Sequence, residues 1–404
     1  MRNVVFVAPF PLETTMRFAR AVGRLAGVRM LGIVQEAPGG ADGALFADIV
    51  TVRDGLDTRQ LVLAARILEK RHGALHRLVG ILEPLQVQLA EVRRELGIAG
   101  TSPVTADLFR DKARMKDELR RHNLPCARHK LIKTWADAEA FVAQVGFPLV
   151  VKPPAGMGSK STWRIENLEQ LRAALGALHA SPDRPALAEE FLRGREFSFE
   201  TITVDGEVRF QSATRYYPTP LEVMEQPWIK WVVVLPRDID GPDYADARAL
   251  GVKTVKALGL ETGMTHMEWF RRDDGSIAIG EIAARPPGAN IVRLNSFAHD
   301  ADMYRAWARA SIDGAFDGPY ERKYAVGCAF LRGGGRGRVS AVHGVDEANR
   351  QVGHLVVESK LPARGTPKSD SYEGDGYVIV RHPDTEVVKR AMNAVIETIQ
   401  VEYA

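Results

Sequence analysis

Cysteine is nearly absent from this 404-residue chain, which contains only Cys126 and Cys328. Two cysteines exclude a disulfide framework and a cysteine-ligated zinc site, and they fit a reducing compartment. No apolar run approaches the roughly 20 residues that a membrane-spanning helix needs. The opening stretch MRNVVFVAPF lacks the pattern of a signal peptide and is typical of a first strand. We therefore expect a cytoplasmic protein that is not attached to a membrane.

A large excess of charge is also missing. The chain has 54 Lys and Arg residues against 51 Asp and Glu residues, which leaves a formal net charge of +3. This balance argues against partners such as nucleic acid or an anionic membrane surface. The one basic stretch, RGGGRGR, is flanked by predicted strands, so we interpret it as a turn rather than an RNA-binding segment.

Several common catalytic motifs are absent as well. The first predicted strand is followed by APFPLETT and not by G-x-G-x-x-G, which excludes the dinucleotide-binding fingerprint there. The loop KPPAGMGSKS matches neither phosphate loop that it resembles. Ser159 stands where a Walker A motif needs glycine, and Ser161 stands where the dinucleotide loop needs its third glycine. We also find no motif for a serine or cysteine nucleophile.

Residues 1–100 do carry a clear alternation of strand and helix patterns. The apolar runs NVVFVAP, RMLGIVQ and LHRLVGIL predict strands. Helical patterns cover residues 14–25, TRQLVLAARILEKRHG and LQVQLAEVRREL, and the last two end at Gly73 and Gly97. This βαβα order predicts a parallel sheet.

The next segment predicts a helix that carries two lysines on one face. Ser102 is a candidate N-cap with Pro103 in the first helical position. We expect the stretch from Arg110 to Lys116 to lie on this helix, with Lys112 and Lys116 on the same face. A strand, a glycine-rich loop and a second strand follow in FPLVVKPPAGMGSKSTWRI.

The glycine-rich loop and a later acidic segment each permit two interpretations. Backbone N–H groups of KPPAGMGSKS could close over phosphates beside Lys152, or the loop is a surface turn with a solvated lysine. In LAEEFLRGRE, the strand end could offer its backbone to an adenine edge and Glu196 could accept from ribose hydroxyls. The alternative is a solvated acidic edge.

The segment HMEWFRRDDGSIAIGEIAAR, residues 266–285, predicts a hairpin that turns at Asp274-Gly275. A two-residue or four-residue loop places Glu268 directly opposite Glu281, where like charges repel. Phe270 and Ile279 then share the face of the two acids, and the other face holds Met267, Trp269, Ala278 and Ile282. Such a pair shares a proton, is neutralised by a cation, or binds a divalent metal. Arg285 is a candidate cation for a simple salt bridge with the acids.

These segments, in this order and spacing, resemble the ATP-grasp superfamily over roughly the whole chain. The resemblance implies an α/β fold with three parts: an N-terminal parallel-sheet, Rossmann-like domain, a two-lobed α+β ATP-grasp fold, and a small strand-rich C-terminal subdomain. We place the parts at residues 1–100, 101–320 and 321–404. The cofactors implied are ATP and Mg²⁺, with Mn²⁺ as a substitute.

The resemblance also implies roles for individual residues. Lys112, Lys152 and the loop 156–161 contact the phosphates, residues 189–192 form the adenine hinge, and Glu196 binds the ribose. The implied ATP contacts are Lys112, Lys152, Gly156, Gly158, Ser159, Ser161, Glu189, Glu190, Phe191, Leu192 and Glu196. Glu268 and Glu281 are the implied metal ligands, and Arg285 the catalytic residue that stabilises the acyl phosphate. Many members carry Asn where this chain has Ala283; the phosphoribosylaminoimidazole carboxylase ATPase subunit is similar to this chain in having Ala there.

The activity implied is that of an ATP- and Mg²⁺-dependent ligase. It activates a small-molecule carboxylate as an acyl phosphate and joins it to an amine or thiol, with amino acids or small acids as expected substrates. Candidate substrate contacts are Glu83, Arg215, Asn290 and Arg293, with the two arginines as a carboxylate clamp. The alternatives are a purine-pathway or bicarbonate-activating enzyme and a regulatory nucleotide-binding module without turnover. A homodimer is the default assembly.

Overall fold

The computed structural model describes residues 1–156, 161–226 and 228–404. Its N-terminal part is a parallel sheet with the strand order β3-β2-β1-β4. The strands are β1 (Arg2–Val7), β2 (Val28–Val34), β3 (Asp48–Thr51) and β4 (Leu75–Val79). The predicted parallel sheet is therefore confirmed, but the short edge strand β3 was not predicted from the sequence, so LHRLVGIL holds the fourth strand and not the third.

Alternate residues of β1 face two different cores because successive side chains of a strand point to opposite faces. Val4 and Phe6 pack with α1, whereas Val5 and Val7 pack with α3 and α4. These helices are α1 (Glu13–Gly23), α3 (Thr58–His72) and α4 (Gln86–Leu96), and α2 (Gly40–Gly43) is a single turn. The C-cap Gly97 has a positive φ of 67°, which glycine adopts readily.

The lysine-bearing helix differs from its prediction. Ser102 does cap α5 (Pro103–Leu108) by accepting from the N–H of Thr105. The chain then leaves the helix, and Asp111 caps a new one, α6 (Lys112–Arg121), by accepting from the N–H groups of Ala113 and Arg114. Arg110 therefore lies between two helices and not within one, because the Asp111 side chain satisfies the first N–H groups of α6.

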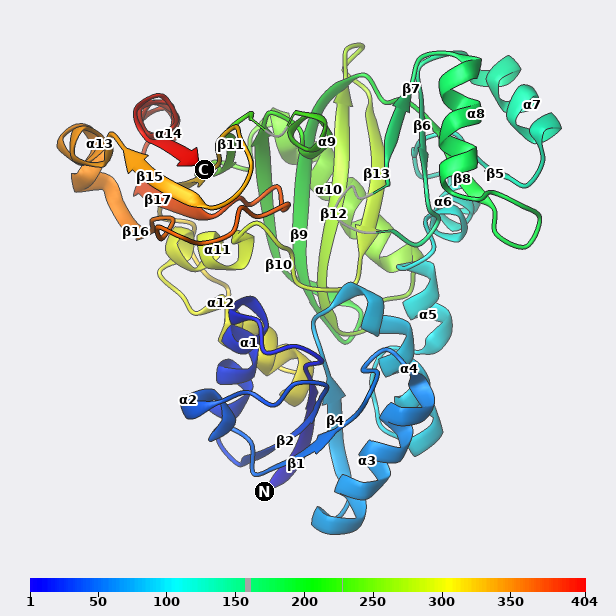
Figure 1. Ribbon diagram of the computed structural model, residues 1–404. Helices are drawn as coiled ribbons and strands as arrows, with labels where there is room; N and C mark the ends of the chain where they lie inside the picture. The colour runs from blue at the N-terminus through cyan, green and yellow to red at the C-terminus, as the bar shows by residue number, and fades with distance from the viewer. Residues whose placement is uncertain (157–160, 227) are drawn as a thin grey trace.

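Two further sheets form two lobes with a cavity between them. The smaller has the order β5-β8-β6-β7 and is backed by α7 (Trp135–Val145) and α8 (Leu168–Ala177). Its strands are β5 (His129–Ile132), β6 (Leu149–Lys152), β7 (Trp163–Ile165) and β8 (Ala186–Glu190). The larger is antiparallel with the order β13-β12-β9-β10-β11-β14-β17-β16. Figure 1 shows the parallel domain below the large sheet and the smaller lobe beside it.

The large sheet joins segments that are far apart in the sequence. It contains β9 (Gly194–Val204), β10 (Glu207–Tyr217), β11 (Trp231–Leu235), β12 (Gly263–Arg272), β13 (Ile277–Ala283), β14 (Ala325–Leu331), β16 (Val356–Lys360) and β17 (Gly376–His382). Strands β14, β16 and β17 come from residues after 321, so the strand-rich C-terminal part extends this sheet. A separate pair is formed by β15 (Val339–His343) and β18 (Gln400–Tyr403), near α13 (Val345–Val352) and α14 (Thr385–Thr398).

Helices after the main hairpin tie the parallel domain to the large sheet. They are α11 (Ile291–His299) and α12 (Met303–Ala308). Two earlier helices, α9 (Pro220–Glu225) and α10 (Pro242–Ala257), precede the hairpin. Trp307 of α12 packs edge-on against Phe6 and Phe18 of the parallel domain. The same core reaches Ile202 in β9, so the two parts share one packed interior. Among the described helices, none is long and apolar enough to cross a membrane.

The hairpin β12–β13 reaches its expected acid pair by a different route. Arg272 donates its backbone N–H to Ser276, so the loop has three residues and not two or four. That loop alone would shift the register by one residue. A bulge that opposes Trp269 to Ile279 leaves Gly280 as the extra residue and restores Glu268 opposite Glu281. The bulge also exchanges the predicted faces beyond it: Ala278 packs beside Phe270, and Ile279 joins the core of Trp269.

Candidate active site

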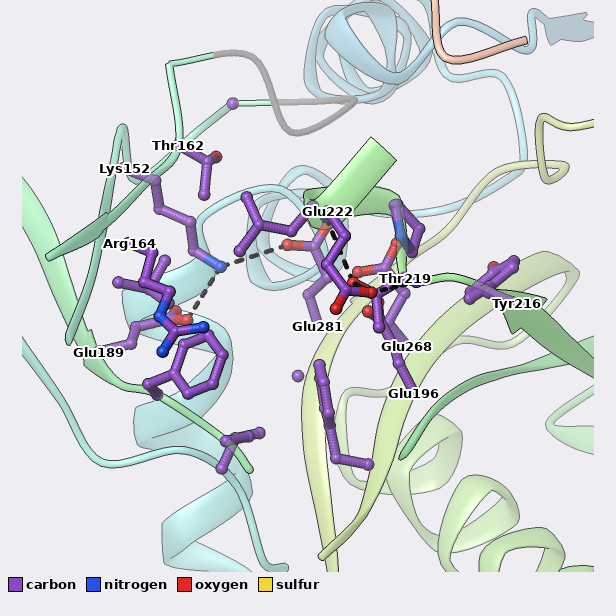
Figure 2. A pocket seen from close by; sticks show the side chains of 18 of the residues that line it. Lys152, Thr162, Arg164, Glu189, Glu196, Tyr216, Thr219, Glu222, Glu268 and Glu281 are labelled. Carbon is purple, nitrogen blue, oxygen red and sulfur yellow. Dashed lines mark hydrogen bonds and ion pairs between the residues drawn. The ribbon is translucent and has the colours of Figure 1, made fainter. Parts of the chain in front are cut away.

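A cavity of about 430 Å³ lies between the two lobes. Side chains of β6 and β8 line one wall, and side chains of β9, β12 and β13 line the opposite wall (Figure 2). Lys152 points across the cavity toward the acids of the hairpin. The cavity therefore brings together the phosphate-binding, hinge and metal candidates from four separate segments of the sequence.

The two hairpin acids share this cavity but differ in their electrostatic surroundings. Lys112 and Lys152 lie 3.4 and 3.6 Å from the carboxylate of Glu281. Burial opposes the charge of Glu281, yet the two ammonium groups outweigh it and lower its pKa to about 2. Burial and the charge of Glu281 instead raise the pKa of Glu268. Among the described residues, only His266 has a basic nitrogen within 4.0 Å of the Glu268 carboxylate, at 3.9 Å.

A third acid, Glu196, completes the negative end of the cavity. Burial raises its pKa well above the usual value, and the charges of Glu268 and Glu281 add to this. A cation placed here would be stabilised by carboxylate oxygens, the ligands that Mg²⁺ prefers. Within residues 1–156, 161–226 and 228–404, however, no three His, Cys, Asp or Glu side chains form a metal site by themselves. The residues thus fit a cation that takes its remaining ligands from a bound molecule.

The two lysines of α6 are four residues apart, a spacing that predicts a shared helix face, and both contact acids of the neighbouring lobes. Lys116 is fully buried and pairs with Glu189 at 2.7 Å. It also donates to the carbonyl oxygen of Gly280 at 2.6 Å, so it joins β8 to the bulge of β13. Lys152 approaches the other oxygen of Glu189 at 2.9 Å. Burial opposes the charge of Glu189 as well, but both ammonium groups lower its pKa to about 2.

These contacts revise the predicted role of the acidic segment. The interpretation of Glu189 as a solvated edge residue is wrong, because only 5% of it is exposed. Its carboxylate holds Lys116 and Lys152, so any contact to adenine at this position would use the backbone. Glu190 pairs with Arg128 at 2.7 Å and Arg272 at 3.2 Å, and so it anchors the end of β8.

The segment after β8 forms an apolar wall of the cavity. Phe191 and Leu192 both line it, and the guanidinium of Arg164 lies 4.6 Å from the centre of the Phe191 ring. Leu192 packs with Ala278 and Phe270 of the hairpin. A flat aromatic base fits between such surfaces, so the position expected for adenine is physically suitable.

Part of the glycine-rich loop is described. The carbonyl oxygen of Gly156 accepts from Lys112 at 2.9 Å and from Arg110 at 3.1 Å, and Gly156 lines the cavity. Gly158 and Ser159 lie outside the described residues. Ser161 is exposed with a φ of 55° and does not line the cavity, whereas the neighbouring Thr162 does. The interpretation of Lys152 as a solvated surface lysine is wrong.

Arg285 takes a partner that the sequence did not indicate. Its guanidinium pairs with Glu83 at 2.9 Å, and Glu83 also pairs with Arg110 at 3.1 Å. Burial opposes the charge of Arg285, but Glu83 raises its pKa above the usual range. The simple salt bridge proposed between Arg285 and the hairpin acids is therefore wrong. Arg285 lines the same cavity as both hairpin acids.

A second cavity of about 530 Å³ adjoins the first, and only two of the four substrate candidates line it. Glu83 and Asn290 line it. Arg215 lies over the rings of Phe197 and Tyr217 and lines neither cavity. Its neighbour Tyr216 does line the first cavity, so Arg215 points to the opposite face of β10.

Arg293 is likewise outside both cavities. It pairs with Glu358 at 2.5 Å and lies over the ring of Phe297. The predicted clamp of Arg215 and Arg293 is wrong, because a charged partner and aromatic rings hold the two guanidinium groups elsewhere.

Sequence reasoning missed a buried histidine next to the acid pair. His266 lies two residues before Glu268 and lines the cavity. Its Nδ1 is 3.0 Å from Glu200, a fully buried acid that accepts from the hydroxyls of Ser198 and Thr214. The two-residue spacing on a strand was the available signal for His266. No local signal pointed to Glu200, which comes from β9.

Comparisons with known proteins agree with this geometry. Residues 117–297 match the family model of the ATP-grasp domain, a range that contains both hairpin acids and Arg285. The chain is 29% identical over 255 residues to the L-arginine-specific L-amino acid ligase of Bacillus subtilis. That match covers 62% of this chain and 60% of the relative, so the chain spans less than two thirds of the relative's length.

Two solved structures share the fold over their full length. The L-amino acid ligase from Bacillus licheniformis superposes with a TM-score of 0.82 at 18% identity, covering 100% of this chain and 99% of that chain. The N5-carboxyaminoimidazole ribonucleotide synthetase from Thermotoga maritima gives a TM-score of 0.72 at 19% identity, with 100% of both chains covered. The expected α/β fold of three parts is thereby confirmed.

Proposed function

Because the chain belongs to the ATP-grasp superfamily, we propose that it is an ADP-forming ligase that joins a carboxylate to an amine. Amino acids are the proposed substrates, since the Bacillus subtilis relative is an L-amino acid ligase. A cytoplasmic location remains part of the proposal and rests on the sequence alone. A homodimer is also proposed, because dimers are the commonest assembly. Sedimentation of the purified chain tests the dimer.

The observation that carries this proposal is the pairing of two acids in one cavity with lysines on one side only. Lys112 and Lys152 approach Glu281, whereas Glu268 has no lysine or arginine within 4.0 Å among the described residues. The lysines suit the phosphates of ATP, the wall of Phe191 and Leu192 suits its base, and Glu196 suits its ribose. Glu268 and Glu281 would hold Mg²⁺ or Mn²⁺, which when bound neutralises charge on the phosphate oxygens.

The proposed reaction needs no nucleophile from the enzyme. A carboxylate oxygen of the substrate attacks the γ-phosphorus, the bond to the bridging oxygen breaks, and ADP leaves. The amine then attacks the acyl carbon, releases inorganic phosphate and loses a proton. Lys152 and Arg285 lie beside the reacting groups, where they stabilise the negative charge of the phosphoryl group and of the acyl phosphate.

Ala283 supports a second candidate activity within the same superfamily. It lies directly opposite His266 in the sheet and offers no metal ligand. The purine-pathway carboxylating enzymes resemble this chain in that alanine, so bicarbonate is the alternative acid. A regulatory module without turnover is disfavoured, because Lys112, Lys152, the two hairpin acids and Arg285 all line one cavity, as phosphoryl transfer requires.

Phosphate release from ATP tests the proposal. Pools of amino acids, and separately bicarbonate with amines, are supplied with Mg²⁺, and products are identified by mass. We expect release that depends on both a carboxylate and an amine, and that Glu281→Gln abolishes while the fold is retained. A matched control is Glu207→Gln, which removes an exposed carboxylate that pairs with Lys256 and lines neither cavity. If ATP binds but no pool raises release above background, the regulatory interpretation gains.

A further inference from the structure

The second cavity carries two opposite charges that do not pair with each other. It lies between α1, the segment 286–290 and the C-terminal segment 369–373. It shares Arg285, Gly288, Ala289 and Tyr372 with the first cavity, so the two spaces meet at Arg285. Arg17 and Glu373 both line the second cavity. No ion pair within 4.0 Å joins them.

The negative charge of Glu373 is only weakly compensated by its neighbours. Its carboxylate accepts one hydrogen bond, from the backbone N–H of Ala289 at 2.8 Å, and no lysine, arginine or histidine of the described residues pairs with it. Burial raises the pKa of the Glu373 carboxyl, and the N–H of Ala289 and the charge of Arg17 only partly offset this. A cationic group that entered the cavity would therefore be attracted to this carboxylate.

Arg17 has weak partners. Its guanidinium contacts Glu13, which is largely exposed, at 3.4 Å, and the oxygens of Asn290 and Tyr377 at 3.5 Å. Arg17 also interacts with the hydroxyl of Tyr304. Apart from the exposed Glu13, these partners are neutral, so the carboxylate of a bound molecule would be a stronger bidentate partner and could replace them. Of the other charged residues that line the cavity, Glu83 and Arg285 pair with each other, and Asp370 is exposed to solvent.

We propose that the second cavity binds two amino acids, with Glu373 holding the α-ammonium group of the acyl donor and Arg17 holding the α-carboxylate of the acceptor. The proposal rests on the ligase activity proposed above and adds which substrate ends are recognised and by which residues. The donor carboxylate must reach Arg285 and the γ-phosphate, so its ammonium group is the end left to recognise. The acceptor amine must reach the acyl carbon, so its carboxylate is left.

This arrangement keeps the two amines chemically distinct. An ammonium group held by Glu373 stays protonated and cannot attack the acyl phosphate, whereas the acceptor amine is free to lose its proton and form the new C–N bond. The aromatic side chains of Phe18, Tyr304 and Tyr372 line the same cavity and can cover the substrate side chains. The size of the cavity, about 530 Å³, is within the usual range for small-molecule sites.

Paired analogues test the assignment with purified full-length protein. The acceptor is compared with its amide, which lacks the α-carboxylate, and the donor with its des-amino acid, which lacks the ammonium group. In the unmodified protein we expect kcat/KM to fall at least about 10-fold for each analogue. Arg17→Ala should remove the preference for acceptor over amide and keep the donor preference. Glu373→Gln should do the reverse.

Two control variants separate recognition from general damage. Arg20→Ala changes an arginine one turn further along α1 that pairs with Glu13 and Asp42 outside this cavity. Asp375→Asn changes an acid of the same C-terminal segment that contacts Ser369 and Tyr403. Both should retain both preferences. Turnover with unchanged preferences in Arg17→Ala and Glu373→Gln overturns this assignment alone, whereas absence of turnover with every amino-acid pair overturns the proposed function.

Discussion

Glu189→Gln should destabilise the protein because it leaves a fully buried lysine without its counter-charge. Lys116 is 0% exposed, and its ammonium group lies 2.7 Å from Glu189. Burial opposes the charge of Glu189, but Lys116 and Lys152 together lower its pKa from 4.5 to about 2. At about 1.4 kcal/mol per pKa unit, this shift corresponds to about 3 kcal/mol for both contacts together. Removal of one partner from a buried ion pair typically costs about 3–5 kcal/mol, which agrees with this value.

The pH dependence of this contribution has a defined sign. The folded-state pKa of Glu189 lies below its unfolded value, so the stabilisation is complete above about pH 4.5. It is lost as the pH falls through about 2, where the carboxylate takes up a proton in the folded state too. The unmodified protein should therefore lose more stability than Glu189→Gln over this range.

Urea unfolding followed by circular dichroism measures the effect. If the free energy of unfolding falls by about 3 kcal/mol per molar urea, the urea concentration at the unfolding midpoint should fall by roughly 1 M. Glu190→Gln is the control and should cost about 1 kcal/mol or less, because its arginine partners are partly exposed. Adding Lys116→Met to Glu189→Gln should restore part of the loss. A loss below about 1 kcal/mol for Glu189→Gln, or no recovery in the double variant, would refute this reasoning.

Two further substitutions probe the hairpin. Gly280→Val should lower both thermal stability and ADP formation, since a Cβ there would lie 3.0 Å from the ring of Phe270 and 3.3 Å from the carbonyl oxygen of Glu268. Unchanged activity would show that the bulge is dispensable. His266→Ala should weaken Mn²⁺ binding by about 10-fold or more in the presence of a non-hydrolysable ATP analogue, because the imidazole held by Glu200 supports Glu268. Electron paramagnetic resonance of free Mn²⁺ measures this, and an unaltered affinity would contradict that role.

Local patterns predicted most of the fold because hydrophobic periodicity and turn chemistry act over short distances. The parallel sheet of residues 1–100 follows from its βαβα order. Strand β3 was missed because its four residues are at most half-buried at a sheet edge and carry little apolar pattern. The break before α6 was missed because it depends on the Asp111 side chain turning back to cap the helix.

The candidate site shows the same division between local and distant determinants. The pairing of Glu268 with Glu281 was predicted from a loop of two or four residues, but the loop has three. The pairing still forms because the extra residue at the Gly280 bulge compensates for the loop length. The ion-pair partners of the arginines could not be predicted from the sequence. Glu83 binds Arg285, which is 202 residues away, because the parallel domain packs against the hairpin. Arg215 and Arg293 were misplaced for the same reason, since strand face and tertiary neighbours decide where a guanidinium lies.

In the proposed reaction, the substrate carboxylate attacks the γ-phosphorus of ATP in the cavity of Glu268, Glu281 and Arg285. Transfer of ¹⁸O from a labelled carboxylate tests it most directly. Once a productive substrate pair is known, the acid is supplied with ¹⁸O in its carboxylate, and the released phosphate is analysed by mass. We expect one ¹⁸O atom in inorganic phosphate for each bond formed, with ADP as the nucleotide product. Unlabelled phosphate, or label in AMP, would contradict it.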